Sequence, residues 1–167
     1  MILLSALPGS GKSTWARKYQ AEHPHTFIVA SDEIRLSLFG RVNDMTHEAL
    51  VWKTFMDQLN GYADQYEDVT VIADATNLQN KYRKLYCEGT PRFDRHVLVR
   101  LEVPYDVCLL QNKMREKDRI VPREAMDRMR CEFEEPSDEI LRMYDDYVVI
   151  RDFMSDKARL KEEKTGR

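Results

Sequence analysis

The first fourteen residues constrain this chain more than any other stretch, because an apolar run leads directly into a glycine-rich loop. The loop residues are Gly9, Ser10, Gly11, Lys12, Ser13 and Thr14. Two glycines let backbone N–H groups turn toward phosphate oxygens, Lys12 supplies a positive charge, and the Ser13 hydroxyl suits Mg²⁺. A helix that begins near Lys12 would point the positive end of its dipole at the same phosphates. The stretch therefore predicts a phosphate-binding loop.

One position departs from the common form of this loop. The pattern G-x-x-x-x-G-K-[ST] begins with glycine, and the residue five before Gly11 is Ala6. Alanine fits there if its backbone φ is negative, so we expect a negative φ at Ala6. A chance glycine-rich turn is the alternative interpretation. The strand-like run before the loop and the periodic stretch after it, residues 15–19, favour phosphate binding.

Length, charge and cysteine content limit the possible classes of protein. A chain of 167 residues has about the length of one domain and is long enough to bury a core. The net charge of −3 excludes a globally basic nucleic-acid coat, whereas an enzyme that contacts only a strand end needs just a local basic patch. Three cysteines without C-x-x-C spacing predict reduced thiols. The short apolar N-terminal run predicts neither a signal nor a membrane segment, so we expect a cytoplasmic protein.

Strand-like and helix-like segments alternate along the chain, which predicts a parallel sheet with helices on its faces. The expected strands are residues 2–6, 26–30, 69–73, 95–103 and 147–150. In the fourth of these, apolar residues alternate with Arg100 and Glu102, so we expect a less buried strand at the sheet edge. The prediction is an α/β P-loop kinase fold over residues 1–150, with a five-stranded parallel sheet flanked by helices and a short lid segment. Residues 151–167 are expected to be a charged tail.

The longest expected helix, residues 46–66, carries apolar residues at three- and four-residue steps. These residues are Ala49, Trp52, Met56 and Leu59. Such a stripe is more typical of a helix face packed in the core than of a ligand site.

Acidic residues stand directly after two of the expected strands, at the edge where such sheets bind ligands. Asp32 follows the strand 26–30, and Arg35 lies one helical turn further on. Phosphoryl transfer needs a group that accepts the proton of the attacking hydroxyl, and Asp32 suits this role. An ordinary acid at a helix start with an i,i+3 partner is the alternative. Asp74 follows the strand 69–73 and could hold Mg²⁺ or could orient Arg35 or Lys12; the sequence leaves both roles open.

A charged segment, residues 115–121, separates the helices expected after Pro104 and from Pro122. It suits a lid that closes over ATP and places a guanidinium on the phosphates, although an ordinary solvated turn is the alternative. The short helix 80–87 carries Lys81, Arg83 and Lys84, for which a solvated face is the simplest interpretation.

Four motifs resemble the kinase domain of the bacteriophage and bacterial polynucleotide 5′-kinase family. Residues 8–17 (PGSGKSTWAR) are similar to the loop of that family, and residues 31–35 (SDEIR) to its D-x-x-R motif. Residues 74–78 (DATNL) resemble its D-x-T-N-L segment, with one residue more than some members carry. Residues 112–115 (NKMR) followed by Val121-Pro122 resemble its lid, with a spacing one residue longer than expected. The resemblance covers about residues 1–150, and no D-x-D-G-T phosphatase signature follows it.

The resemblance implies a role for each motif. The aspartate of D-x-x-R serves as general base and its arginine binds a phosphate of the acceptor strand, which maps these roles to Asp32 and Arg35. The lid arginine that contacts ATP phosphates maps to Arg115, and Arg119 competes for the same role because of the longer spacing.

Residues and resemblance together predict ATP- and Mg²⁺-dependent transfer of the γ-phosphate to a 5′-hydroxyl end of RNA or DNA. The predicted catalytic residues are Lys12, Asp32 and Arg115. The predicted ATP-binding residues are Gly9, Ser10, Gly11, Lys12, Ser13, Thr14, Arg115 and Arg119. The predicted metal ligands are Ser13 and Asp74, and the predicted substrate-binding residues are Arg35, Asp74, Asn77 and Arg83.

Two other functions remain open at this point. A kinase for a small metabolite would use the same machinery on a different hydroxyl. A regulator that binds ATP without transferring phosphate is the second alternative, although Asp32 would have no purpose in it. RNA or DNA preference and oligomeric state are left open by the sequence.

Overall fold

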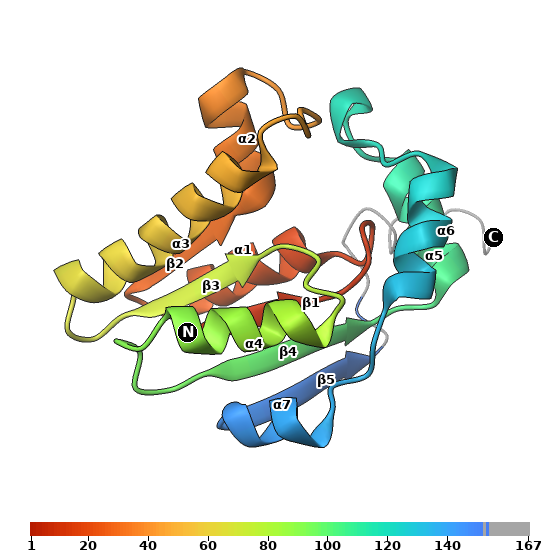
Figure 1. Cartoon of the computed structure of the whole chain (residues 1–167). Helices are drawn as coiled ribbons and strands as arrows, with labels where there is room; N and C mark the ends of the chain where they lie inside the picture. Colours follow the sequence, from red (N-terminus) through yellow and green to blue (C-terminus); the bar gives the residue numbers. More distant parts are fainter. Residues whose placement is uncertain (152, 154–167) are drawn as a thin grey trace.

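A computed structural model of the chain describes residues 1–151 and 153. The described residues form an α/β fold in which helices cover both faces of one sheet (Figure 1). In chain order, the elements are β1 (Ile2–Ser5), α1 (Lys12–Glu22), β2 (Thr26–Ala30), α2 (Ser31–Phe39), α3 (Glu48–Gln65), β3 (Thr70–Asp74), α4 (Asn80–Gly89), β4 (Val97–Glu102), α5 (Tyr105–Lys113), the 3₁₀ turn η1 (Lys117–Arg119), α6 (Arg123–Glu132), α7 (Asp138–Met143) and β5 (Asp146–Arg151).

The five strands are all parallel, and their order in the sheet is β2-β3-β1-β4-β5. This confirms the predicted fold class. Because β1 and β3 are neighbours, the loop after β1 begins beside the end of β3, where Asp74 lies. Ala30, the last residue of β2, is in register with Asp74. The carboxyl ends of these three strands therefore place the phosphate-binding loop, Asp74 and the start of α2 at one edge of the sheet.

Successive residues of the central strands pack into separate cores on the two faces of the sheet. Leu3 belongs to the core beneath α3, α4 and α7, together with Phe55 and Tyr86. Leu4 belongs to the core beneath α1, together with Ala16. A strand that is buried on both faces needs apolar residues at successive positions. This explains why the sequences of β1 and β3 are nearly continuous apolar runs.

The apolar stripe predicted for residues 46–66 is correct only in part. Its buried centre is formed by Val51, Phe55 and Leu59, which are spaced four residues apart and are fully buried. Trp52 packs beside this centre, but Ala49 is exposed. The stripe is therefore rotated around the helix relative to the prediction, because the four-residue spacing places Val51 rather than Ala49 against the sheet.

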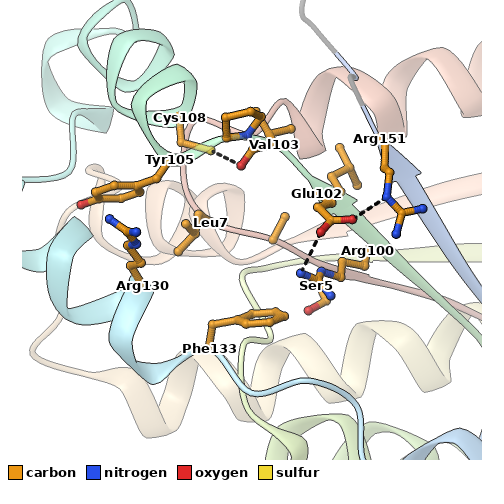
Figure 2. A pocket seen from close by; sticks show the side chains of 13 residues that line it. Ser5, Leu7, Arg100, Glu102, Val103, Tyr105, Cys108, Arg130, Phe133 and Arg151 are labelled. Atoms are coloured by element: carbon orange, nitrogen blue, oxygen red, sulfur yellow. Dashed lines mark hydrogen bonds and ion pairs between the residues drawn. The ribbon is translucent and has the colours of Figure 1, made fainter.

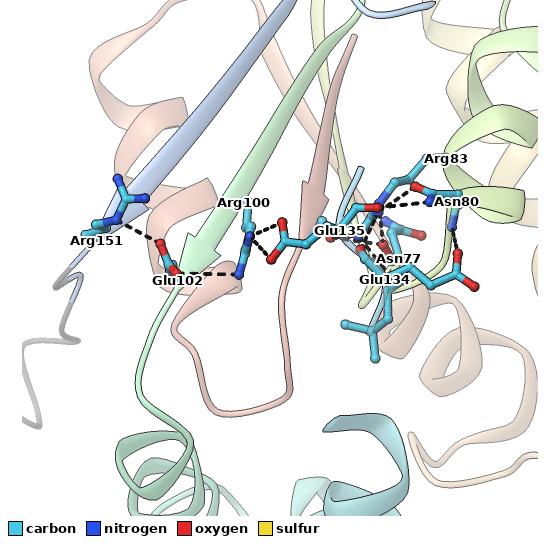
Figure 3. Close-up of polar contacts among 10 residues, drawn as sticks. Asn77, Asn80, Arg83, Arg100, Glu102, Glu134, Glu135 and Arg151 are labelled. Atoms are coloured by element: carbon cyan, nitrogen blue, oxygen red, sulfur yellow. Dashed lines mark hydrogen bonds and ion pairs between the residues drawn. The ribbon is translucent and has the colours of Figure 1, made fainter. Parts of the chain in front are cut away.

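The prediction that residues 95–103 form an edge strand is wrong. The strand β4 lies between β1 and β5, and Leu98 and Val99 are buried in the cores on its opposite faces. Its two charged residues, Arg100 and Glu102, form ion pairs. Arg100 Nη1 is 2.7 Å from Glu135 Oε1, and Glu102 Oε2 is 2.8 Å from Arg151 Nε (Figure 3). Arg100 and Glu102 stand at the carboxyl end of the strand, where both line a cavity. An interior strand can therefore carry charge at this end.

Among the described residues, no helix combines the length and the apolar character that crossing a bilayer requires.

Candidate active site

Six of the eight residues predicted to bind ATP, residues 9–14, lie together in the loop after β1 and the first turn of α1. Gly9 and Gly11 have φ values of 77° and 91°, in the left-handed region that favours glycine. A Cβ atom at Gly9 would collide with the backbone oxygen of Cys108 in α5, so no other residue fits there. Ala6 is not among the described non-glycine residues with positive φ, which confirms the expectation that alanine is tolerated at this position.

Polar groups of the loop are left for a ligand. The Ser10 hydroxyl is buried and has no hydrogen-bond partner among the described residues. The helix α1 begins after Gly11 and has no side-chain cap, so its first N–H groups and the positive end of its dipole face the loop. Buried polar groups and helix N-termini normally have partners. The loop therefore fits the phosphate groups of a nucleotide.

Lys12, Ser13 and Asp74 form the inner part of the site. Lys12 is 9% exposed, and its Nζ donates to the backbone oxygen of Leu7 at 3.0 Å. Burial lowers the pKa of Lys12, and the nearby carboxylate of Asp74 opposes that change. Burial likewise raises the pKa of Asp74, and Lys12 opposes it. Each charge thus compensates the other in a buried setting.

The hydroxyl of Ser13 and the carboxylate of Asp74 form a pair of oxygen donors suited to Mg²⁺. Ser13 Oγ donates to Asp74 Oδ2 at 2.6 Å. Mg²⁺ prefers oxygen ligands, and P-loop enzymes hold it with the serine or threonine after the lysine and an acid on a neighbouring strand. Metal binding and orientation of Lys12 both stay predictions for Asp74, whose charge also offsets the burial of Lys12. Arg35 bonds to other carboxylates.

Asp32 lies at the start of α2, where three arginines converge on its carboxylate. Arg35 Nη1 is 3.3 Å from Asp32 Oδ1, Arg115 Nη2 is 3.4 Å from Asp32 Oδ2, and Arg119 Nη1 is 3.8 Å from Asp32 Oδ2. The Asp32 side chain remains 35% exposed, so a substrate can still reach it. The structure thus brings the predicted base together with both arginines that were predicted for the lid, which follow it by more than eighty residues.

The predicted lid segment, residues 115–121, lies between α5 and α6 and extends toward α2 (Figure 1). Its base is closed by Asn112, which donates from Nδ2 to the oxygen of Val121 at 2.7 Å and accepts at Oδ1 from the Val121 N–H at 3.1 Å. The helix expected after Pro104 is α5, which ends at Lys113. Pro122 directly precedes α6.

The two lid arginines differ in their partners. Among the residues that the structure describes, Arg115 has one ion pair, with Asp32. Arg119 also pairs with Glu33 at 2.8 Å and with Glu116 at 3.5 Å. Because fewer carboxylates hold Arg115, its guanidinium can move to a phosphate with fewer ion pairs to break. This supports Arg115 over Arg119.

Arg35 is 5% exposed and all of its guanidinium nitrogens bind carboxylates. Its Nε and Nη2 donate to the two oxygens of Glu48, each at 2.9 Å, and Nη1 donates to Asp32. The guanidinium also lies 5.9 Å from the ring centroid of Trp52. Glu48 was missed by the sequence reasoning, because it begins α3 on the far side of a loop and shares no local spacing with Arg35.

Two residues predicted to bind substrate are not in the site. Asn77 is 4% exposed and its amide donates to the backbone oxygen of Leu4 at 2.8 Å. Arg83 is fully buried, and its guanidinium donates to oxygens of β1, of the β3–α4 loop and of the α6–α7 linker (Figure 3). The prediction for both is wrong, because both side chains are buried and hold chain segments together.

Comparison with known proteins agrees with this fold. A family model described as an AAA domain (AAA_33) matches residues 1–136. Protein kti12 of Schizosaccharomyces pombe is 23% identical over 154 residues, which cover 82% of this chain and 52% of that protein. The chain therefore spans about half the length of this curated relative.

Two solved structures are similar over nearly the whole chain. Kti12 of Chaetomium thermophilum in complex with ADP-AlF3 matches with a TM-score of 0.65 and 18% identity, covering 99% of this chain and 96% of that one. A sugar kinase from Janibacter sp. HTCC2649 matches with a TM-score of 0.63 and 18% identity, covering 98% and 91%. At this level of identity the likeness concerns the fold, which is that of P-loop kinases.

Proposed function

This chain belongs to the AAA domain family, and we propose that it transfers the terminal phosphoryl group of ATP to a hydroxyl group of a small acceptor. The observation that carries the proposal is the convergence of three arginines on Asp32 at the edge of the phosphate-binding loop. A protein that only binds ATP needs no carboxylate there, whereas a kinase needs a base for the acceptor and cations for the transferred group.

Each residue of the site has a role in this reaction. Asp32 accepts the proton of the attacking hydroxyl, and Arg35 keeps its carboxylate oriented. Lys12 neutralises charge on the terminal phosphates, and Arg115 moves from Asp32 to the phosphoryl group during transfer. Mg²⁺ held by Ser13 and Asp74 would supply the remaining positive charge on the phosphates.

The partners of Arg35 support an acceptor without a phosphate next to its hydroxyl. An arginine that binds a phosphate bidentately must present two N–H groups to it. In Arg35 these groups are occupied by Glu48, and the side chain is buried. A phosphate would have to displace Glu48 and leave a carboxylate without its partner. Phosphorylation of a sugar or another small hydroxyl compound is therefore the function that the geometry supports best.

Phosphorylation of a 5′-hydroxyl end of RNA or DNA is the second candidate. Its support is the contact between Asp32 and Arg35, one helical turn apart, in the segment that resembles the D-x-x-R motif of polynucleotide 5′-kinases. In this function the acceptor phosphate would take the place of Glu48 on Arg35.

An acceptor screen with labelled ATP and Mg²⁺ tests the proposal. The panel should contain sugars and other polyols, nucleosides, nucleoside 3′-monophosphates and oligonucleotides with a 5′-hydroxyl, with Lys12→Ala as the inactive control. We expect label on an acceptor that carries no phosphate. Label on nucleoside 3′-monophosphates and oligonucleotides alone would replace the proposal by the second candidate. Release of phosphate that no acceptor stimulates would contradict both.

A further inference from the structure

A second concave site lies behind the phosphate-binding loop, outside the cluster around Asp32. It is a cavity of about 530 Å³ between the ends of β1 and β4, the first turn of α5 and the end of α6 (Figure 2). Its lining includes neither Lys12 nor Asp32 nor Asp74. Its volume lies within the range of small-molecule sites.

Aromatic rings and guanidinium groups from separate elements face this cavity. Tyr105 comes from α5 and Phe133 directly follows α6. The guanidinium of Arg100 in β4 lies 4.5 Å from the ring centroid of Phe133, and that of Arg130 in α6 lies 4.6 Å from the ring centroid of Tyr105. Arg151 at the end of β5 completes the set. Rings beside guanidinium groups suit a ligand that is both planar and negatively charged.

Two of the three arginines are neutralised by carboxylates. Arg100 pairs with Glu135 at 2.5 Å, and Arg151 pairs with Glu102 at 2.8 Å. Arg130 has no ion-pair partner within 4 Å among residues 1–151 and 153, because Asp127 and Glu132 of its helix pair with Arg123 and Arg128. Its guanidinium rests on the ring of Tyr105. The cavity therefore has about one surplus positive charge, which suits a ligand with one phosphate better than one with three.

We propose that this cavity binds a nucleoside monophosphate, with the base against Phe133 and the phosphate on Arg130. Base stacking on an aromatic ring and a charge-assisted bond from guanidinium to phosphate are the interactions that the lining offers. The proposal concerns residues outside the transfer site and does not depend on the acceptor of the transferred phosphate.

A ligand in the cavity would touch the segments that shape the phosphate-binding loop. Leu7 lines the cavity, and its backbone oxygen accepts the hydrogen bond from Lys12 Nζ. Cys108 also lines the cavity, and its backbone oxygen packs against Gly9. Binding in the cavity therefore changes the affinity of the loop for ATP, and the coupling must be reciprocal.

Calorimetric titration of AMP into the whole chain, with ADP and Mg²⁺ at saturation in the phosphate-binding loop, tests this. We expect one AMP per chain, and at least ~10-fold weaker binding of adenosine, which lacks the phosphate. Arg130→Ala should weaken AMP binding by at least ~10-fold. The matched control is Arg128→Ala on the same helix, since Arg128 lies outside the cavity and its side chain is 67% exposed. This variant should bind AMP as the wild type does.

Two further variants separate the cavity from the phosphate-binding loop. Phe133→Leu should weaken AMP binding while ADP binding persists, and Lys12→Ala should leave AMP binding in place. Absence of AMP binding at saturating ADP would overturn the proposal. AMP binding that is lost in Lys12→Ala but unaffected by Arg130→Ala would also overturn it, because AMP would then occupy the loop.

Discussion

Two arginines are buried near the same edge of the sheet, and they are held in opposite ways. Arg35 lies beside the phosphate-binding loop and binds the carboxylates of Glu48 and Asp32. Arg83 belongs to α4, is fully buried, and donates five hydrogen bonds within the described part of the chain, all to neutral oxygens of the backbone or side chains. Burial lowers the pKa of Arg83. A guanidinium that joins backbone carbonyls of several segments stabilises the fold, whereas one that binds an exposed reactive carboxylate orients it.

The comparison shows that a buried charge does not by itself mark an active site. The partners of the charge and their exposure decide its role. By this criterion we propose that the cluster around Asp32 is functional and that the cluster around Arg83 is structural. The two clusters should respond differently to substitution, one in turnover and the other in stability.

The largest expected effect is in the functional cluster. Lys12→Ala should abolish phosphoryl transfer, because the terminal phosphates lose their nearest positive charge. Folding should be affected little, since burial of the Lys12 ammonium is itself unfavourable. Transfer of labelled phosphate and thermal unfolding check the two statements. Turnover above about a tenth of the wild-type value would contradict the proposal that Lys12 stabilises the transition state.

The lid arginines give the next largest effect. Arg115→Ala should lower kcat by roughly 10³-fold with a smaller change in the Kd of ATP, because this arginine meets the phosphates only during transfer. Arg119→Ala is the matched control and should cost less, because Glu33 and Glu116 hold Arg119 away. Steady-state kinetics and ATP titration measure both variants. A larger loss of kcat at Arg119 would exchange their roles.

The structural cluster should show the reverse pattern. Arg83→Met should lower the free energy of unfolding by about 3 kcal/mol, because several buried oxygens lose their donor. Turnover per folded molecule should stay within about threefold of the wild type. Urea denaturation and kinetics check this, with Lys84→Met on the exposed face of α4 as the control that leaves the midpoint nearly unchanged. Loss of turnover in Arg83→Met without loss of stability would contradict the assignment of Arg83 to a structural cluster.

The smallest expected effect concerns His96, a half-buried histidine away from both clusters. Burial lowers the pKa of His96, whose ring is 2.8 Å from the Thr90 hydroxyl. The folded state therefore binds fewer protons than the unfolded state just below the usual pKa of about 6.5. Stability should be complete above that pH and decline as the pH falls through it. Urea midpoints between about pH 5 and pH 8 should show this slope, and His96→Gln should reduce it. An unchanged slope would exclude His96 as its source.

The central elements could be predicted from the sequence because their signals are local. The glycines lie within a few residues of the apolar run of β1, and Asp32 lies within two residues of the end of β2. The order of the strands could not be predicted in this way. The interior position of β4 depends on its pairing with β1 and β5, whereas the charged residues at its end suggested an edge strand. Pairing is set by the whole chain.

Contacts between distant segments account for the remaining errors in the site. Glu48 lies thirteen residues after Arg35 and across a loop, so no helical spacing links them. The charge of Arg83 suggested a solvated or substrate-facing position, but the linker after α6, some fifty residues later, covers it. No local pattern contains that information, because burial of a polar residue depends on the segments that pack over it.

The central claim is that Asp32 accepts the proton of the hydroxyl that receives the phosphate, and Asp32→Asn tests it most directly. Asparagine keeps the shape of the side chain and removes its basicity. ATP binding should remain close to that of the wild type, while turnover on the acceptor found in the screen should fall by roughly 10²–10⁴-fold. Near-normal turnover with normal ATP binding would contradict the account, because the carboxylate would then have no part in the reaction.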